Sequence, residues 1–272
     1  MKSLWAATLV AMLILSGCER ADTTAGAGDN QAGESAALTA TATEESKEQL
    51  VARAGAPLFD GLGNHHHVIT TNDPGAQRYF NQGLVLAFAF NHAEAIRSFR
   101  AAQRLDDDCA MCFWGEALAT GPNINVTSKG KVIMSTDERV AAYAALQKAV
   151  ERKDRVSQAE RDYIDALAAR YHVDPAVERD PLDLAYADAM RALANKYPDD
   201  VDASTLFAEA LMNTMPWNYW SEKGAPKPAT LEVLTMLEAA LEKIANGEGV
   251  YGAQAHEYKQ IARAALQPGD VE

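Results

Sequence analysis

The sequence predicts an all-α fold, a short helical solenoid of about four helix pairs with inserted loops. Beyond Phe59 the apolar residues recur every three or four positions, which is the period of an amphipathic helix, and strand-like alternation is scarce. One spacing of small and bulky residues repeats along the chain, as expected when similar helix pairs stack. With 48% apolar and 23% charged residues among 272, the chain has the composition of an ordinary globular protein.

The N-terminus predicts export and lipidation. Lys2 precedes an apolar run, residues 4–15, that is too short for a mature membrane span and is followed by two small residues. The string Leu15-Ser16-Gly17-Cys18 resembles the lipobox of bacterial lipoproteins. This resemblance implies a signal peptide over residues 1–17, cleavage before Cys18 and acylation of that cysteine. A plain signal peptide with an incidental cysteine is the alternative.

A flexible linker is expected after the lipidated cysteine. Residues 19–57 contain no Phe, Trp, Tyr or His and are rich in Ala, Thr, Gly and acidic residues. Such a segment cannot bury enough apolar surface to offset the entropy of ordering. We therefore expect a lipid-anchored linker over residues 18–56 and a helical repeat domain over residues 57–272. Glu19 stands where inner-membrane lipoproteins carry Asp, and this analogy implies an outer-membrane anchor facing the periplasm, with no other membrane contact.

The first helix pair is predicted from Gly83, Ala95 and Ala102, small residues whose spacing lets two antiparallel helices pack closely. The spacing resembles the 34-residue tetratricopeptide repeat, and this resemblance implies a right-handed solenoid. The later pairs show the same recurrence, at Ala117 with Ala142, Leu167 with Tyr186, and Ala208 with Val233.

Four polar motifs predict where helices begin. Asp73-Pro74 and Asp180-Pro181 each place an N-cap acceptor before a proline, which has no amide hydrogen to leave unpaired. Ser135-x-x-Glu138 and Ser157-x-x-Glu160 match the capping box, in which the two residues bond reciprocally to each other's backbone.

The inserted loops indicate a binding edge. The second and fourth pairs are each longer than the first by 13 residues between their two helices, and the third is longer by about seven. All the extra residues fall on one edge of the predicted solenoid, and insertions aligned in this way commonly form a binding face. The candidate partner-binding residues on this edge are Asn91, His92, Asn123, Asn125, Trp217, Tyr219 and Trp220. The alternatives are a structural imidazole hydrogen-bonded to backbone at His92, and aromatic rings that pack down over the fourth repeat.

Four strings occur in a distinctive order, at residues 65–71, 90–95, 109–115 and 121–125. Together they resemble a group of bacterial tetratricopeptide-repeat proteins, often exported, whose biochemical role is unassigned. Relatives in that group continue with a His- and Tyr-rich helix and further repeats. Residues 251–272 match that helix poorly, so we expect a shortened member of the group.

The cysteines and histidines allow a metal hypothesis. With Cys18 lipidated, Cys109 and Cys112 remain at C-x-x-C spacing, and Phe113 stands where covalent haem attachment needs His. In an oxidising periplasm the pair is expected to form a disulfide; thiol–disulfide exchange and metal binding are the alternatives.

The metal alternative draws on the histidine triplet as well. Cys109, Met111 and Cys112 are soft ligands suited to copper, and imidazoles from His65-His66-His67 would complete a copper or zinc site. An ordinary surface loop is the other interpretation of the triplet.

The net charge and the absence of known catalytic motifs exclude several classes of function. The 38 acidic and 25 basic residues give a net charge of −13, which repels phosphate backbones and argues against nucleic acid as a partner. The sequence contains no Ser-His-Asp order, phosphate loop or H-E-x-x-H, so no enzyme activity and no required cofactor are expected. The leading hypothesis is a membrane-anchored periplasmic scaffold that binds a protein or peptide. Copper or zinc binding is the first alternative, and an enzyme with an unrecognised site is the second.

Overall fold

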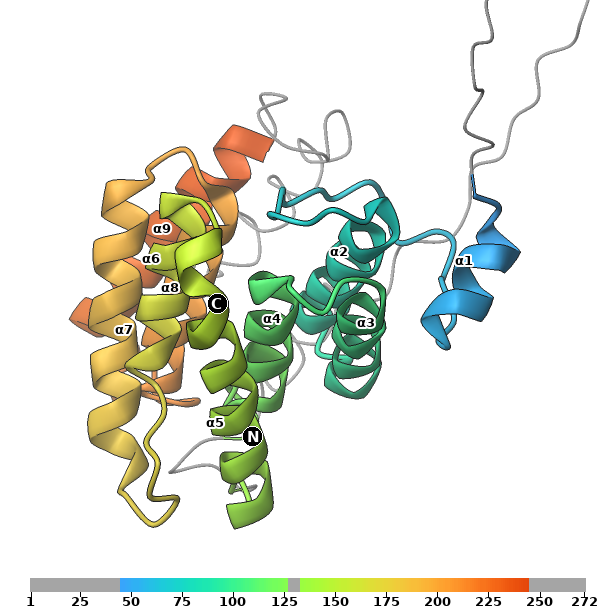
Figure 1. Cartoon of the computed structure of the whole chain (residues 1–272). Coiled ribbons are helices and arrows are strands. Elements are labelled where there is room, and N and C mark those ends of the chain that lie inside the picture. The colour runs from blue at the N-terminus through green and yellow to red at the C-terminus, as the bar shows by residue number, and fades with distance from the viewer. Residues whose placement is uncertain (1–44, 127–132, 245–272) are drawn as a thin grey trace, which may run out of the picture.

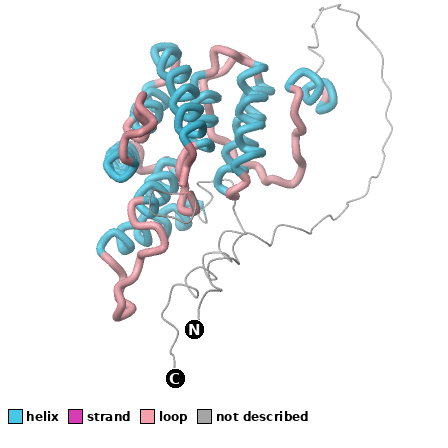
Figure 2. The backbone as a smooth tube through the Cα atoms, turned by 90° about the horizontal axis from the view of Figure 1, so that it is seen from below, coloured by secondary structure: helices cyan, strands magenta, loops and turns pink. Residues whose placement is uncertain are grey.

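The computed structural model describes residues 45–126 and 133–244, and within these ranges the chain is helical, without strands (Figures 1 and 2). This confirms the all-α prediction. The predicted signal peptide, Cys18 and the linker up to residue 44 lie outside the described residues. The helices are α1 (Lys47–Ala54), α2 (Pro74–Phe88), α3 (His92–Leu105), α4 (Ala110–Thr120), α5 (Thr136–Arg152), α6 (Gln158–Ala168), α7 (Arg179–Lys196), α8 (Val201–Asn213) and α9 (Pro228–Lys243), with a short 3-10 helix at Lys153–Arg155.

Each helix from α2 to α9 packs against the next one in the chain. The four predicted pairs correspond to α2 with α3, α4 with α5, α6 with α7, and α8 with α9. The small and bulky positions that marked the pairs are all buried. Among the described helices, none combines the length and hydropathy needed to cross a membrane.

Phe99 explains why small residues recur in the first two pairs. Its side chain is fully buried between α2 and α4. A Cβ atom added to Gly83 would lie 2.8 Å from the Phe99 ring, and one added to Gly115 would lie 2.3 Å from it. Such approaches are far inside van der Waals contact, so both glycines are needed for these helices to pack this closely.

The linker prediction is wrong for its last residues. Residues 47–54 form α1, which begins with a capping box at Ser46 and packs on α3 (Figure 1). Leu50 and Ala54 are buried, and Arg104 Nε donates a hydrogen bond to the Ala54 carbonyl at 2.7 Å. The composition of residues 19–57 taken as a whole did not predict this helix. A short helix of eight residues is stabilised by its packing against α3, which composition does not show.

The capping predictions are confirmed at three of the four motifs. Asp73 caps α2, and Ser135 and Ser157 form complete capping boxes at α5 and α6. The prediction at Asp180 is wrong, because α7 already begins at Arg179. Arg179 is buried and pairs with Asp183 one turn later at 2.5 Å, so this ion pair spans Pro181 in the first turn of the helix.

Candidate functional site

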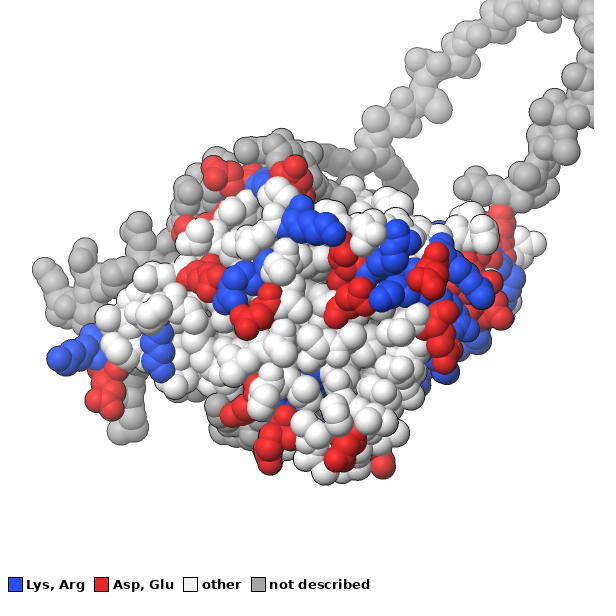
Figure 3. Space-filling model, turned by 60° about the vertical axis from the view of Figure 1, so that its left-hand side comes forward, with Lys and Arg blue, Asp and Glu red and all other residues white. Residues whose placement is uncertain are grey.

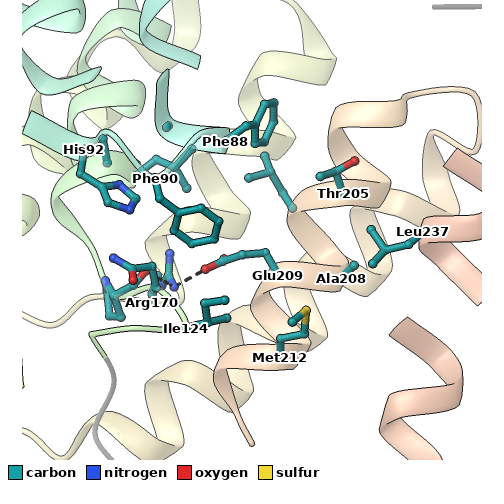
Figure 4. Close-up of a pocket in the computed structure, with 16 residues that line it drawn as sticks. Phe88, Phe90, His92, Ile124, Arg170, Thr205, Ala208, Glu209, Met212 and Leu237 are labelled. Atoms are coloured by element: carbon teal, nitrogen blue, oxygen red, sulfur yellow. Dashed lines mark hydrogen bonds and ion pairs between the residues drawn. The ribbon is translucent and has the colours of Figure 1, made fainter. Parts of the chain in front are cut away.

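A cavity of about 210 Å³ opens where several helices end (Figure 4). It is lined by Phe88 at the end of α2, Ala119 near the end of α4, Arg170 just after α6, and Met212 near the end of α8. These are the first helices of the four predicted pairs. The cavity therefore lies on the side of the helix array from which the predicted insertions leave; we call this side the cavity edge.

A charge pair of a buried arginine and a partly exposed glutamate forms the polar part of the cavity lining. Arg170 is 1% exposed; its guanidinium donates to the Pro122 carbonyl at 2.7 Å and lies 3.9 Å from a Glu209 oxygen (Figure 4). The same group stacks over the Tyr186 ring at 4.4 Å. Burial raises the pKa of Glu209, although Arg170 and a hydrogen bond from Asn213 act in the opposite direction. Because the charges of Arg170 and Glu209 neutralise each other, a charged ligand would find no unpaired opposite charge in the cavity.

His92 faces the cavity without a hydrogen-bond partner. It is the first residue of α3, and neither of its buried ring nitrogens bonds to any described residue. The backbone hydrogen bond considered for a structural imidazole is therefore not made. Burial lowers the pKa of His92, and the positive charge of Arg170 adds to this effect. A neutral imidazole offers one donor and one acceptor, so His92 can orient an uncharged polar group.

Two exposed aromatic residues have an unusual backbone conformation. Phe90 (φ 60°) and Trp217 (φ 59°) are the non-glycine residues with positive φ in the described part of the chain. They are 48% and 61% exposed, and each lies in a loop that joins the two helices of a pair. A bulky residue is rare in this conformation, and such strain is concentrated at functional sites. Phe90 also lines the cavity, with its ring edge-on to His92 at 5.9 Å.

The other predicted partner-binding residues are spread along the same loops. Asn123 lines the cavity, and its side-chain oxygen accepts a hydrogen bond from the Asn125 backbone at 2.9 Å, while Asn125 is exposed. Asn91, Asn125 and the three aromatic residues of the α8–α9 loop are outside the cavity lining. Trp217 and Trp220 are exposed rather than packed down over the repeat, whereas the Tyr219 hydroxyl is buried.

Sequence reasoning missed Phe90, Arg170 and Glu209. Glu209 had a local signal, since it is a lone acidic residue in the apolar run from Leu206 to Met212. Arg170 had none, because its burial depends on which helix ends meet around it.

The predicted metal ligands do not come together as one set. Cys109 and Cys112 form a disulfide at the start of α4, and Met111 is buried beside them. Cysteine binds a metal as the thiolate, which neither sulfur is in a disulfide. The expected site that combines these cysteines with the histidine triplet is therefore wrong. His65 and His67 instead face Asp202 of α8, and His66 contacts Asn81 at 2.9 Å.

Charges on the surface are mixed. On the face shown in Figure 3, Lys and Arg side chains lie beside Asp and Glu rather than in a patch of one sign. Ion pairs of the described residues include Arg100 with Glu116 at 2.7 Å and Arg53 with Glu45 at 2.8 Å. This face therefore lacks the clustered basic residues typical of nucleic-acid binding.

Comparisons of the chain with protein-family models, curated proteins and solved structures found no match.

Proposed function

We propose that this protein is a lipid-anchored periplasmic scaffold, a right-handed solenoid of tetratricopeptide type, that binds a protein or peptide partner at the cavity edge. The observation that carries the proposal is the cavity beside Phe90, an exposed aromatic residue in a strained conformation. The four successive helix pairs support the repeat type, and the string that ends at Cys18 supports the anchor at the outer membrane.

The cavity fits one uncharged aromatic side chain of the partner. Its volume of about 210 Å³ exceeds the about 150 Å³ of an apolar cavity that binds benzene, so it has room for a substituted ring. Arg170 is already paired with Glu209, and His92 is held neutral, which disfavours a charged occupant. A tyrosine or tryptophan side chain would place its ring among the apolar walls and its polar group at His92.

The α8–α9 loop extends the binding surface. It begins shortly after the lining residue Met212 and carries Trp217 and Trp220, both exposed. Tryptophan is enriched among the residues that dominate binding energy in interfaces, so these two exposed rings on the cavity edge are candidates for partner contact.

The test uses alanine-based peptides of equal length that carry Trp, Tyr, Ala or Glu at one guest position. Fluorescence anisotropy should detect binding of the Trp and Tyr peptides and not of the others. Phe90→Gly should weaken this binding at least tenfold, because the ring that borders the cavity is lost. The same change should leave the unfolding free energy unchanged or raise it by about 1 kcal/mol, since glycine relieves the left-handed conformation.

The matched control is Phe59→Ala, which removes another exposed phenylalanine that is not part of the cavity lining. It should leave peptide binding unchanged. Equal binding of the Ala and Trp peptides, or a destabilised Phe90→Gly variant that binds normally, would show that the cavity edge is not the partner site.

A further inference from the structure

Two imidazoles and a carboxylate meet on the other side of the helix array, in a cluster that shares no residue with the cavity lining. His65 Nε2 lies 3.2 Å from one oxygen of Asp202, and His67 Nδ1 lies 2.8 Å from the other. The two histidines are two positions apart, as on one face of an extended segment, and His66 between them is exposed and turned to Asn81. The three consecutive histidines therefore differ: His65 and His67 point toward Asp202, and His66 points away from it.

A second carboxylate completes the cluster. Asp200, the N-cap of α8, places an oxygen so that the ligand atoms of His67, Asp200 and Asp202 all lie within 4.8 Å of one another. Zinc–nitrogen and zinc–oxygen bonds of about 2.0–2.1 Å put tetrahedral ligands about 3.3 Å apart, so these three ligand atoms would have to draw closer around the ion. His65, which lies beside Asp202 but outside this group of three, would turn toward the ion as the fourth ligand. We propose that His65, His67, Asp200 and Asp202 bind one divalent transition-metal cation, with Zn²⁺ as its representative.

His65 offers a second ring nitrogen to the carboxylate that His67 contacts. Its Nε2 atom is buried and lies at ion-pair distance from Asp202, outside the geometry of a good hydrogen bond, so a metal cation can take the place of a proton between the two atoms. Two neutral imidazoles and two carboxylates also balance the charge of a divalent cation.

Neighbouring groups hold the ligands in position. Tyr163 donates its hydroxyl hydrogen to Asp200 at 2.7 Å, and the Ala203 backbone amide donates to the other Asp200 oxygen at 3.0 Å. The His67 ring packs edge-on against Tyr163 at 5.4 Å. Contacts of this kind fix the orientation of ligating side chains in metal sites. The side chains of His65, His67 and Asp202 are 17%, 13% and 10% exposed, so a cation can reach them from solvent.

The donor atoms decide which metal is expected. Nitrogen together with oxygen suits Zn²⁺ and its neighbours in the transition series, whereas Ca²⁺ and Mg²⁺ take oxygen ligands and copper(I) prefers sulfur. The site is therefore distinct from the copper site that the cysteines would have made.

The experiment uses the full-length untagged chain in detergent, stripped of metal by a chelator and titrated with Zn²⁺ against a chromogenic competitor. One equivalent should bind. His67→Ala and Asp202→Asn should each weaken binding at least tenfold, and His66→Ala, the matched control in the same segment, should leave it unchanged. His65→Gln, at a position with less ring packing, serves as a further ligand variant, and circular dichroism melting verifies that every variant folds.

Co²⁺ provides a second readout. The bound ion should give visible d–d bands without the near-ultraviolet thiolate transition that the cysteine set would produce. Less than one equivalent of Zn²⁺, equal weakening by His66→Ala, undiminished binding by a His65→Ala/His67→Ala double variant, or a thiolate transition would overturn the proposal. No peptide is present in these measurements, so their outcome is independent of the function proposed for the cavity.

Discussion

The buried histidines at the opposite ends of α6 and α8 have different surroundings, because His65 and His67 lie beside a carboxylate and His92 does not. At the cavity edge, His92 and the Nε atom of Arg170 have no hydrogen-bond partner among the described residues. The other end, where residues 65–70 contact the first turns of α6 and α8, we call the histidine edge. There His67 pairs with Asp202, and both oxygens of Glu160 accept hydrogen bonds from Thr70 at 2.6 Å.

The pKa values of His92 and His67 shift in opposite directions at the two edges. Burial lowers the pKa of His92, and no carboxylate counteracts it. Burial also acts to lower the pKa of His67, but its hydrogen bond and charge interaction with Asp202 outweigh this and raise it. An unpaired imidazole stays neutral and suits an uncharged ligand, whereas an imidazole among carboxylates belongs to an ionic cluster. Partners therefore indicate the role of a buried histidine better than burial alone.

The largest expected loss of stability follows from removing one partner of the charge pair at the cavity edge. Arg170→Leu should lower the unfolding free energy by about 2–4 kcal/mol, because the partly buried Glu209 loses its nearest cation and the Pro122 carbonyl loses its hydrogen-bond donor. The double change Arg170→Leu/Glu209→Leu should recover part of this loss, since two apolar side chains leave no unpaired charge. Urea unfolding of both variants measures the difference. A double variant no more stable than the single one would show that the pair is not coupled.

A smaller effect is expected at the histidine edge. Tyr163→Phe should cost about 1.5–3 kcal/mol, the range for a hydrogen bond to a charged group, because Asp200 loses the hydroxyl donor. Tyr197→Phe is the matched control, since its hydroxyl bonds to Asp162 at 2.5 Å in a more exposed place and should cost less. Thermal and urea unfolding of the two variants compare them directly. Equal losses would contradict the expectation that the more buried hydroxyl of Tyr163 stabilises the fold more than that of Tyr197.

The smallest expected effect is on the pH dependence of the unfolding free energy, and it depends on His92. His92 has a folded-state pKa below its ordinary value of 6.5, so the unfolded chain takes up this proton at a higher pH than the folded chain. Its contribution to stability is therefore present above pH 6.5 and decreases as the pH falls toward the folded-state pKa. His92→Gln should make the unfolding free energy less dependent on pH below this value. An unchanged pH profile would mean that the imidazole is not shielded in the folded state.

Local features of the fold were predictable from sequence and long-range ones were not. Helical periodicity, the N-cap at Asp73 and the capping boxes act within a few residues, and these predictions are confirmed. Helix α1 was missed because its single buried leucine, Leu50, gains significance only from the neighbouring α3. His67 and Asp202 are 135 positions apart, and no spacing rule links them. The inserted loops lie on the edge where the cavity opens, and their role in binding stays a prediction. The buried Arg170 could not be placed without knowing how the helix ends meet.

Stacked repeat proteins usually behave as one-dimensional chains, in which each unit contacts only its neighbours and the units can separate in turn. Here His67, just ahead of the first helix pair, contacts Asp202 in the fourth. Phe88 of α2 and Leu237 of α9 line the same cavity. The segment ahead of α2 therefore links the first helix pair to the fourth, although α2 and α3 do not pack against α8 and α9. We expect this link to oppose fraying of the fourth pair alone, so that the described residues unfold more cooperatively than an open stack of repeats would.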